Sequence, residues 1–177
     1  MKRIRLIQFH LGVAAFFIPF MLLMPLSGVL HLADLGENQS KTAAFTIADV
    51  VPEDKAAHEE FFREQFKKQG LDFSFEYIRY GGKDFTFRPS SRVHYMASQT
   101  DAGLEVYKLD PNLGRRIMEI HKGHGPRFMR WVQGGFGVAM ILVTLSGIWL
   151  AVTIPAYRRI MLGSVGAGAL LILLALL

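Results

Sequence analysis

The sequence predicts an α-helical integral membrane protein with three transmembrane helices and a small α+β domain inserted between the first and the second. Hydrophobic residues make up 51% of the 177 residues, more than a soluble domain usually needs for its core. They gather in three runs that contain no charged side chain, at 11–30, 131–155 and 160–177. Because about 20 apolar residues cross the hydrocarbon of a bilayer as a helix, these runs predict membrane spans.

The runs divide the chain into a first transmembrane helix at 1–32, an extramembrane domain with its linkers at 33–125, and two further helices at 126–155 and 156–177. The first run is too long for the apolar part of a signal peptide, so we expect a retained helix. The third run is the shortest. A full span is expected there, and a re-entrant segment is the alternative.

Basic residues beside the spans predict the orientation, because Lys and Arg concentrate on the cytoplasmic side of a membrane. With three spans, the N-terminal cluster and the connection between the second and third helices lie on the same side. Both are basic (Lys2, Arg3, Arg5, Arg158, Arg159). Residues 33–125 then face the outside. Five basic residues just before the second span count against this orientation, unless they serve a site there: Arg115, Arg116, Lys122, Arg127 and Arg130.

The extramembrane domain begins with helix signals. Pro52 with Glu53 and Asp54 is typical of a helix start, and Lys67 and Lys68 before a glycine are typical of an end. The residues between them carry an apolar stripe at helical spacing. They predict one amphipathic helix of about five turns.

Alternating aromatic and polar residues follow this helix. Segments 72–80 and 83–88 predict a hairpin with its turn at Gly81 and Gly82, and segments 92–98 and 104–109 predict a second pair. A four-stranded antiparallel meander has one apolar face to bury, so we expect the helix to cover it. The domain shows no catalytic triad pattern and no substrate pocket. We expect its histidines, His58 and His94, to be surface or edge residues.

Some chemistry is excluded by composition. The chain has no cysteine, so thiol catalysis, disulfides and iron–sulfur sites within it are excluded. The net charge of +5 is accounted for by the basic clusters beside the spans. No basic stretch is interleaved with aromatic residues, so a nucleic-acid partner is not expected.

Four histidines lie near the predicted membrane boundaries: His10 and His31 in the first helix, and His121 and His124 before the second. Neutral imidazole is a common metal and haem ligand. His10 and His31 are about 31 Å apart along a helix, so they cannot bind one iron atom. His31 with His121 or His124 suits bis-imidazole ligation of a b-type haem. Histidines that simply occupy the membrane interface are the alternative.

Two features near His121 and His124 bear on this hypothesis. Pro126 disfavours helical geometry at the preceding residue, which predicts that the two histidines lie on a separate surface turn. The neighbouring basic side chains could pair with haem propionates or with lipid phosphates, and both readings stay open. They are Arg115, Arg116, Lys122 and Arg127.

Several short motifs resemble those of the PepSY-associated transmembrane helix proteins of bacteria. The resemblance covers nearly the whole chain and rests on the order of its elements. These are Phe9-His10-Leu11-Gly12, Leu26-Ser27-Gly28-Val29-Leu30-His31 with Ala33-Asp34-Leu35-Gly36 after it, Ile120-His121-Lys122-Gly123, and Leu145-Ser146-Gly147-Ile148-Trp149-Leu150.

The resemblance implies a PepSY-like periplasmic domain, a helix packed on a small antiparallel sheet, in a protein of the bacterial inner membrane. Similar proteins include inner-membrane reductases that bind haem b and reduce ferric siderophores. The resemblance implies that His10, His31 and His121 are the matching histidines, whereas His124 has no counterpart. The chain departs from those reductases in having three predicted helices rather than four or more, and in lacking a second histidine to pair with His10.

Two functions follow as hypotheses. The first is electron transfer through haem b to a periplasmic redox partner or ferric chelate. His31 and His121 would bind the iron, with His124 and Arg127 nearby. A homodimer or another membrane subunit would complete the site at His10. The second is a cofactor-free accessory subunit of a larger inner-membrane complex that binds a periplasmic partner through its extramembrane domain.

Overall fold

The structure is a computed structural model that describes residues 2–33, 38–100 and 103–177. The chain divides into two compact units. One combines Met1–Met21 with Gly134–Leu177, and the other is Leu22–Gln133. Of the motifs in the sequence, the segment 34–36 lies outside the described residues, as do two residues of the expected turn at 100–103.

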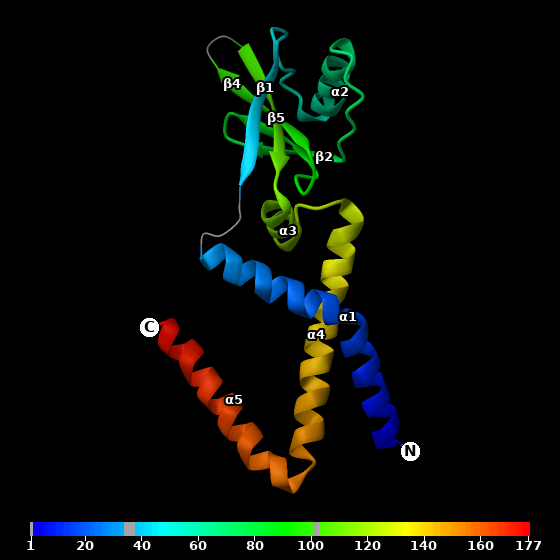
Figure 1. Ribbon diagram of the computed structural model, residues 1–177, viewed down its shortest axis with the longest axis vertical. Coiled ribbons are helices and arrows are strands. Elements are labelled where there is room, and N and C mark those ends of the chain that lie inside the picture. The colour runs from blue at the N-terminus through cyan, green and yellow to red at the C-terminus, as the bar shows by residue number, and fades with distance from the viewer. Residues whose placement is uncertain (1, 34–37, 101–102) are drawn as a thin grey trace. The chain divides into compact units, whose positions relative to one another are not determined.

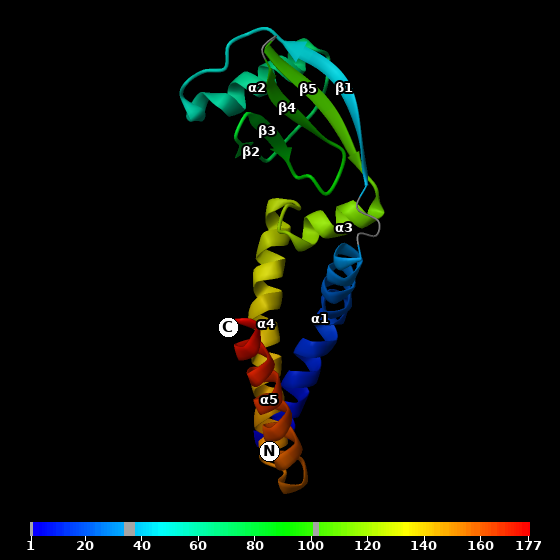
Figure 2. The same cartoon turned by 90° about the vertical axis from the view of Figure 1, so that its left-hand side faces the viewer.

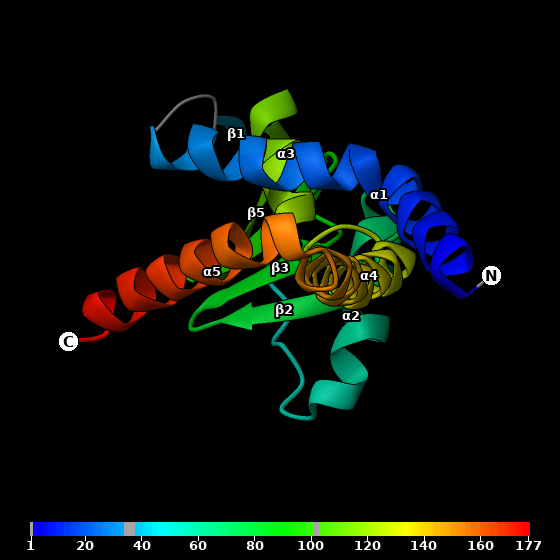
Figure 3. The same ribbon diagram turned by 90° about the horizontal axis from the view of Figure 1, so that it is seen from below.

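Among the residues that the structure describes, three helices are long and apolar enough to cross a membrane, which confirms the three helices that the charge-free runs predict. They are α1 (Lys2–Leu32), α4 (Arg127–Val152) and α5 (Pro155–Ala175). In the first unit, Phe17 and Phe20 of α1 each lie 5.6 Å from the ring of Phe136 on α4. Helix α5 begins with Pro155, a residue favoured in a first turn. It runs away from α4 (Figures 1 and 3), and none of its residues is buried.

The second unit contains a five-stranded antiparallel sheet in the order β1-β5-β4-β3-β2 (Figure 2). Its strands are β1 (Gln39–Ile47), β2 (Tyr77–Gly81), β3 (Asp84–Arg88), β4 (His94–Thr100) and β5 (Gly103–Pro111). The predicted meander is confirmed as β2 to β5, with a shorter first strand. The expected number of four strands is wrong, because β1 pairs with β5 and extends the sheet.

The helix of this domain is shorter than predicted. The start signals produce a single 3-10 turn, η1 (Lys55–Ala57), which Asp54 caps by accepting a hydrogen bond from the Ala56 amide at 2.9 Å. The α-helix itself, α2, runs over His58–Lys68. Roughly three turns of α-helix therefore replace the five that the sequence predicts.

The core lies between α2 and one face of the sheet, as the sequence predicts. Phe62 and Phe66 on α2 are 0% and 1% exposed and pack against Phe87 on β3, which is also fully buried. Ala97 on β4 and Val106 on β5 complete the same cluster. Aromatic rings bury a large area each, which lets so small a domain form a core.

The expectation that His58 and His94 are surface or edge residues is wrong. Their exposed fractions are 6% and 3%. Each buried ring has one backbone partner: Nε2 of His58 lies 2.7 Å from the Pro52 carbonyl oxygen, and Nδ1 of His94 lies 2.9 Å from that of Arg92. A buried polar group that keeps a hydrogen bond avoids most of its desolvation cost.

Candidate functional sites

His10 and His121 are each hydrogen-bonded to a serine of another helix. In the first unit, Nδ1 of His10 on α1 lies 2.8 Å from Oγ of Ser146 on α4. The next residue, Gly147, lies against the same ring: a β carbon there would be 3.6 Å from Cε1 of His10. In the second unit, Nδ1 of His121 lies 2.7 Å from Oγ of Ser27, a buried residue of α1.

The serines determine which ring nitrogen carries the proton. Oγ of Ser27 also donates to the Met24 carbonyl oxygen at 2.9 Å, and Oγ of Ser146 donates to that of Val143 at 3.0 Å. A hydroxyl has one hydrogen, so both contacts exist together only when the imidazole donates from Nδ1. The lone pair of each neutral ring is then on Nε2. This is the arrangement in which a second hydrogen bond orients a histidine for metal binding.

His31 lies four residues after Ser27 on α1. Residues at this spacing share one face of a helix, with β carbons about 5–6 Å apart. His31 is exposed and in the last turn of α1. Ser27 is therefore adjacent to both histidines. His31 is its neighbour along the face of α1, and His121 is its hydrogen-bond partner.

A short helix, α3 (Leu113–His121), determines where the next two histidines lie. Asn112 caps its start by accepting from the Arg115 amide at 2.9 Å. At its end, the amides of Gly123 and His124 donate to the carbonyl oxygens of Ile120 and Glu119 at 2.9 and 2.8 Å. Gly123 has φ +74°, so this is a Schellman turn with glycine in the left-handed region.

The turn separates the roles of the two histidines. His121 ends α3 and contacts Ser27, whereas the chain then reverses and brings His124 back over α3. Nδ1 of His124 lies 3.0 Å from Oε2 of Glu119, and Nε2 lies 3.2 Å from Nη1 of Arg79. Because both ring nitrogens are engaged, we assign His124 to a polar cluster rather than to the candidate iron ligands. The predicted separate surface turn is thus a helix end with a defined cap.

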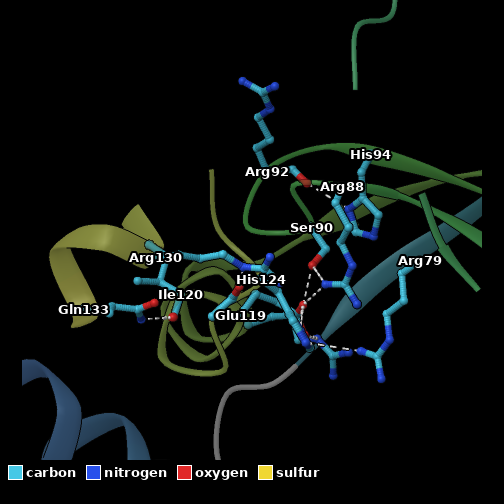
Figure 4. A network of polar contacts seen from close by, with 12 residues as sticks. Arg79, Arg88, Ser90, Arg92, His94, Glu119, Ile120, His124, Arg130 and Gln133 are labelled. Carbon is cyan, nitrogen blue, oxygen red and sulfur yellow. Dashed lines mark hydrogen bonds and ion pairs between the residues drawn. The ribbon is translucent and has the colours of Figure 1, made fainter. Parts of the chain in front are cut away.

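The polar cluster is centred on a buried ion pair (Figure 4). Nη1 of Arg88 on β3 lies 2.8 Å from Oε2 of Glu119 on α3, and each side chain is 6% exposed. Ser90 accepts from Arg88 and donates to Glu119. Arg115 adds a second cation, with Nε 3.3 Å from Oε1 of Glu119.

The charges within this cluster follow from its contacts. Burial alone would raise the pKa of Glu119, but hydrogen bonds from Ser90 and Arg88 and the charge of Arg88 outweigh it and lower the pKa from 4.5 to about 2. Burial lowers the pKa of His124, and the charge of Arg88 lowers it further. Burial also lowers the pKa of His94. At neutral pH the cluster therefore holds a charged carboxylate among cations, with both imidazoles neutral.

Arg127, the remaining sequence candidate, lies at the start of α4. Its amide donates to the Glu76 carboxylate at 2.7 Å, and its guanidinium donates to the Glu76 carbonyl oxygen at 2.6 Å. The guanidinium carbon is 5.9 Å from the centre of the Tyr77 ring. These contacts tie the beginning of α4 to the segment that leads into β2.

Sequence reasoning missed the two serines and the buried ion pair. A signal for the serines was present: an aliphatic or aromatic residue followed by His-x-Gly occurs at 9–12 and 120–123, and Leu-Ser-Gly occurs at 26–28 and 145–147. In the structure each histidine pairs with the serine of the other copy of this repeat. The ion pair had no such signal, since its partners are separated by 31 residues.

The described residues contain no group of three or more His, Asp or Glu side chains arranged for a metal ion. A haem iron is held by one or two protein ligands, so this observation does not bear on haem. Fold and sites define a membrane protein with three apolar helices and an α+β domain that contains a buried ion cluster. Comparisons with protein-family models, curated proteins and solved structures gave no match to this chain.

Proposed function

We propose that this chain is a membrane-bound b-type haem protein that passes electrons to an acceptor outside the membrane, and that His31 and His121 are the residues that would hold the haem iron. The observation that carries the proposal is the hydrogen bond between His121 and Ser27, because it makes Nε2 of an exposed imidazole the nitrogen with the lone pair. A haem iron between two imidazoles would supply one-electron chemistry at this place.

The donor chemistry of the chain fits such a group. His121 is oriented through Nδ1 by a buried hydroxyl, the kind of support that metal-bound histidines usually have. His31 supplies a second imidazole from the same face of α1 that bears Ser27. The chain contains no cysteine, so imidazole is the strongest haem ligand it offers near the end of α1.

The pair formed by His10 and Ser146 supports a second ligand position. Its hydrogen bonds leave the lone pair of His10 on Nε2, as in His121. One copy of the chain contributes one such histidine there. We propose that a homodimer, or another membrane subunit, supplies the second imidazole.

The proposal includes a location and a kind of acceptor. We propose that the chain belongs to a bacterial inner membrane with its N-terminus in the cytoplasm and residues 33–125 in the periplasm. The basic residues beside the spans support this orientation. The packing of α2 on an antiparallel sheet, together with the order of the short motifs, supports a PepSY-like domain. A ferric chelate or a periplasmic flavoprotein is the acceptor class that follows.

The test is the visible spectrum of the full-length protein purified from a haem-replete host. A low-spin b-type spectrum that changes on reduction is expected, and His31→Ala and His121→Ala should each lose its low-spin character. Added imidazole should restore that character in both variants. Leu32→Ala, which changes an exposed apolar neighbour of His31 on α1, is the matched control and should keep the wild-type spectrum.

Two results would contradict the proposal: wild-type protein that takes up no haem when haem is in excess, or variants that both retain the low-spin spectrum. The first result would favour the second candidate function, a cofactor-free accessory subunit. The specific observation in favour of that candidate is α5, which has no buried residue and so offers its whole surface to lipid or to another subunit.

A further inference from the structure

The second unit contains a cavity of about 390 Å³ on the face of the sheet opposite α2. Thr86 and Arg88 on β3 line it, and they alternate with Phe85 and Phe87, which face the core. Strand β4 contributes to the cavity in the same way through His94. Helix α3 and the turn after it form another side, through Glu119 and His124 among others.

The lining of this cavity is strongly cationic. Arg79, Arg88, Arg115 and Lys122 line it, and Glu119 is the single carboxylate among the lining residues that the structure describes. The histidines of the lining, His94 and His124, have lowered pKa values and are neutral at pH 7. Within this described part of the lining, cationic side chains therefore outnumber carboxylates. A cavity with low-dielectric walls and charge of one sign concentrates counter-ions.

Arg88 is the buried member of this set, with an exposed fraction of 5%. Its Nη1 atom is used by Glu119 and Ser90, but its Nε–H has no hydrogen-bond partner among the described residues. A buried donor without an acceptor costs free energy, and a guanidinium offers its donors in a planar arrangement that matches an oxyanion. The cluster thus contains an unused donor beside a cationic cavity.

We propose that this cavity binds a small oxyanion, a carboxylate or phosphate group, with Arg88 at its base and Arg79 and Lys122 at its rim. Carboxylate and phosphate oxygens are the acceptors that guanidinium groups bind most strongly. The carboxylate of Glu119 is not the oxyanion that fills the cavity, because its two oxygens are already engaged by Arg88, Ser90, His124 and Arg115. The same oxyanion chemistry is offered by a soluble metabolite or by the headgroup of an anionic phospholipid.

The experiment uses the full-length protein in nanodiscs of neutral phosphatidylcholine, titrated with citrate and with inorganic phosphate by calorimetry. Saturable binding of at least one of these probes is expected. A double variant, Arg79→Gln with Lys122→Gln, should bind it roughly tenfold more weakly or worse, since it removes two charge-assisted hydrogen bonds. Lys67→Gln with Lys83→Gln removes the same charge from exposed positions that do not line the cavity, and should bind like the wild type.

A second arm uses nanodiscs that contain phosphatidylglycerol and measures hydrogen exchange of β3 and α3. Protection that depends on this lipid, lost in the double variant at Arg79 and Lys122, with no binding of citrate or phosphate, identifies a lipid headgroup as the source of the oxyanion. The proposal is overturned if neither soluble probes nor anionic lipid bind, or if the double variant and its charge-matched control bind equally. Haem content has no part in either readout, so the outcome is independent of the proposed electron-transfer function.

Discussion

The Glu119→Gln substitution tests whether the buried ion cluster stabilises the sheet domain. Glu119 is the one carboxylate among the described residues that line the cavity, and its side chain is 6% exposed. Glutamine keeps the size of the side chain but removes its charge. The substitution leaves the guanidinium of Arg88 buried without a counter-ion. It also removes the carboxylate that forms hydrogen bonds with Ser90 and His124.

The magnitude follows from the pKa of Glu119, which falls from 4.5 to about 2 in the folded protein. A difference of about 2.5 units corresponds to about 3–4 kcal/mol in favour of the charged form, at about 1.4 kcal/mol per unit. Removing one partner of a buried ion pair typically costs about 3–5 kcal/mol. Both routes give a loss of at least about 3 kcal/mol in the free energy of unfolding of this domain.

The assay is hydrogen exchange of the full-length protein in nanodiscs, followed by mass spectrometry of peptides from β3 and α3. A loss of about 3 kcal/mol predicts exchange roughly a hundredfold faster at pH 7. Glu64→Gln is the matched control, because Glu64 is an exposed residue of α2 that loses the same charge. Its exchange should stay close to that of the wild type.

The pH dependence gives a second readout with a definite sign. Because the folded pKa of Glu119 is lowered, its contribution is fully present above pH 4.5 and is lost as the pH falls towards 2. Wild-type protection of β3, corrected for intrinsic exchange rates, should decline through this window, and the variant should lack this part of the decline. The reasoning would be refuted if the variant were as well protected as the wild type at pH 7, or if protection declined equally in both proteins at low pH.

Two further substitutions test the turn after α3 and the orientation of His121. Gly123→Ala places a β carbon at φ +74°, which should destabilise the end of α3 by about 1 kcal/mol and speed exchange of its last turn roughly fivefold, whereas unchanged exchange would argue against the Schellman turn. Ser27→Ala should weaken haem binding by roughly 10- to 100-fold in titrations with limiting haem, and Ser27→Thr should restore it, since the hydroxyl orients the ring. Equal affinity in the alanine variant and the wild type would show that His121 needs no such support.

Local patterns in the sequence were sufficient for the long helices and for the central hairpins. A charge-free run and an alternation of aromatic and polar residues each report directly on the surroundings of their own segment. Strand β1 lacks this information. Its residues QSKTAAFTI are mostly exposed, with only Ile47 buried, so it is a strand because β5 offers it a partner. Pairing over such a distance cannot be read from a single segment.

The same limit explains what was missed at the sites. The burial of His58 depends on the position of the Pro52 carbonyl oxygen, a detail of backbone geometry. The ion pair of Arg88 and Glu119 forms only once β3 and α3 are in place. In contrast, the membrane-boundary histidines could be selected as candidates from the sequence, because an imidazole beside a charge-free run is visible there wherever its partner lies.

Helix α3 connects the two proposals through its own geometry. Glu119 and His121 are two residues apart, so they lie about 200° apart around the helix and face nearly opposite sides. One side carries the carboxylate of the oxyanion cavity, and the other carries the imidazole that contacts Ser27 on α1. The turn at Gly123 then returns His124 to the Glu119 side. A helix of only nine residues therefore contributes to both sites.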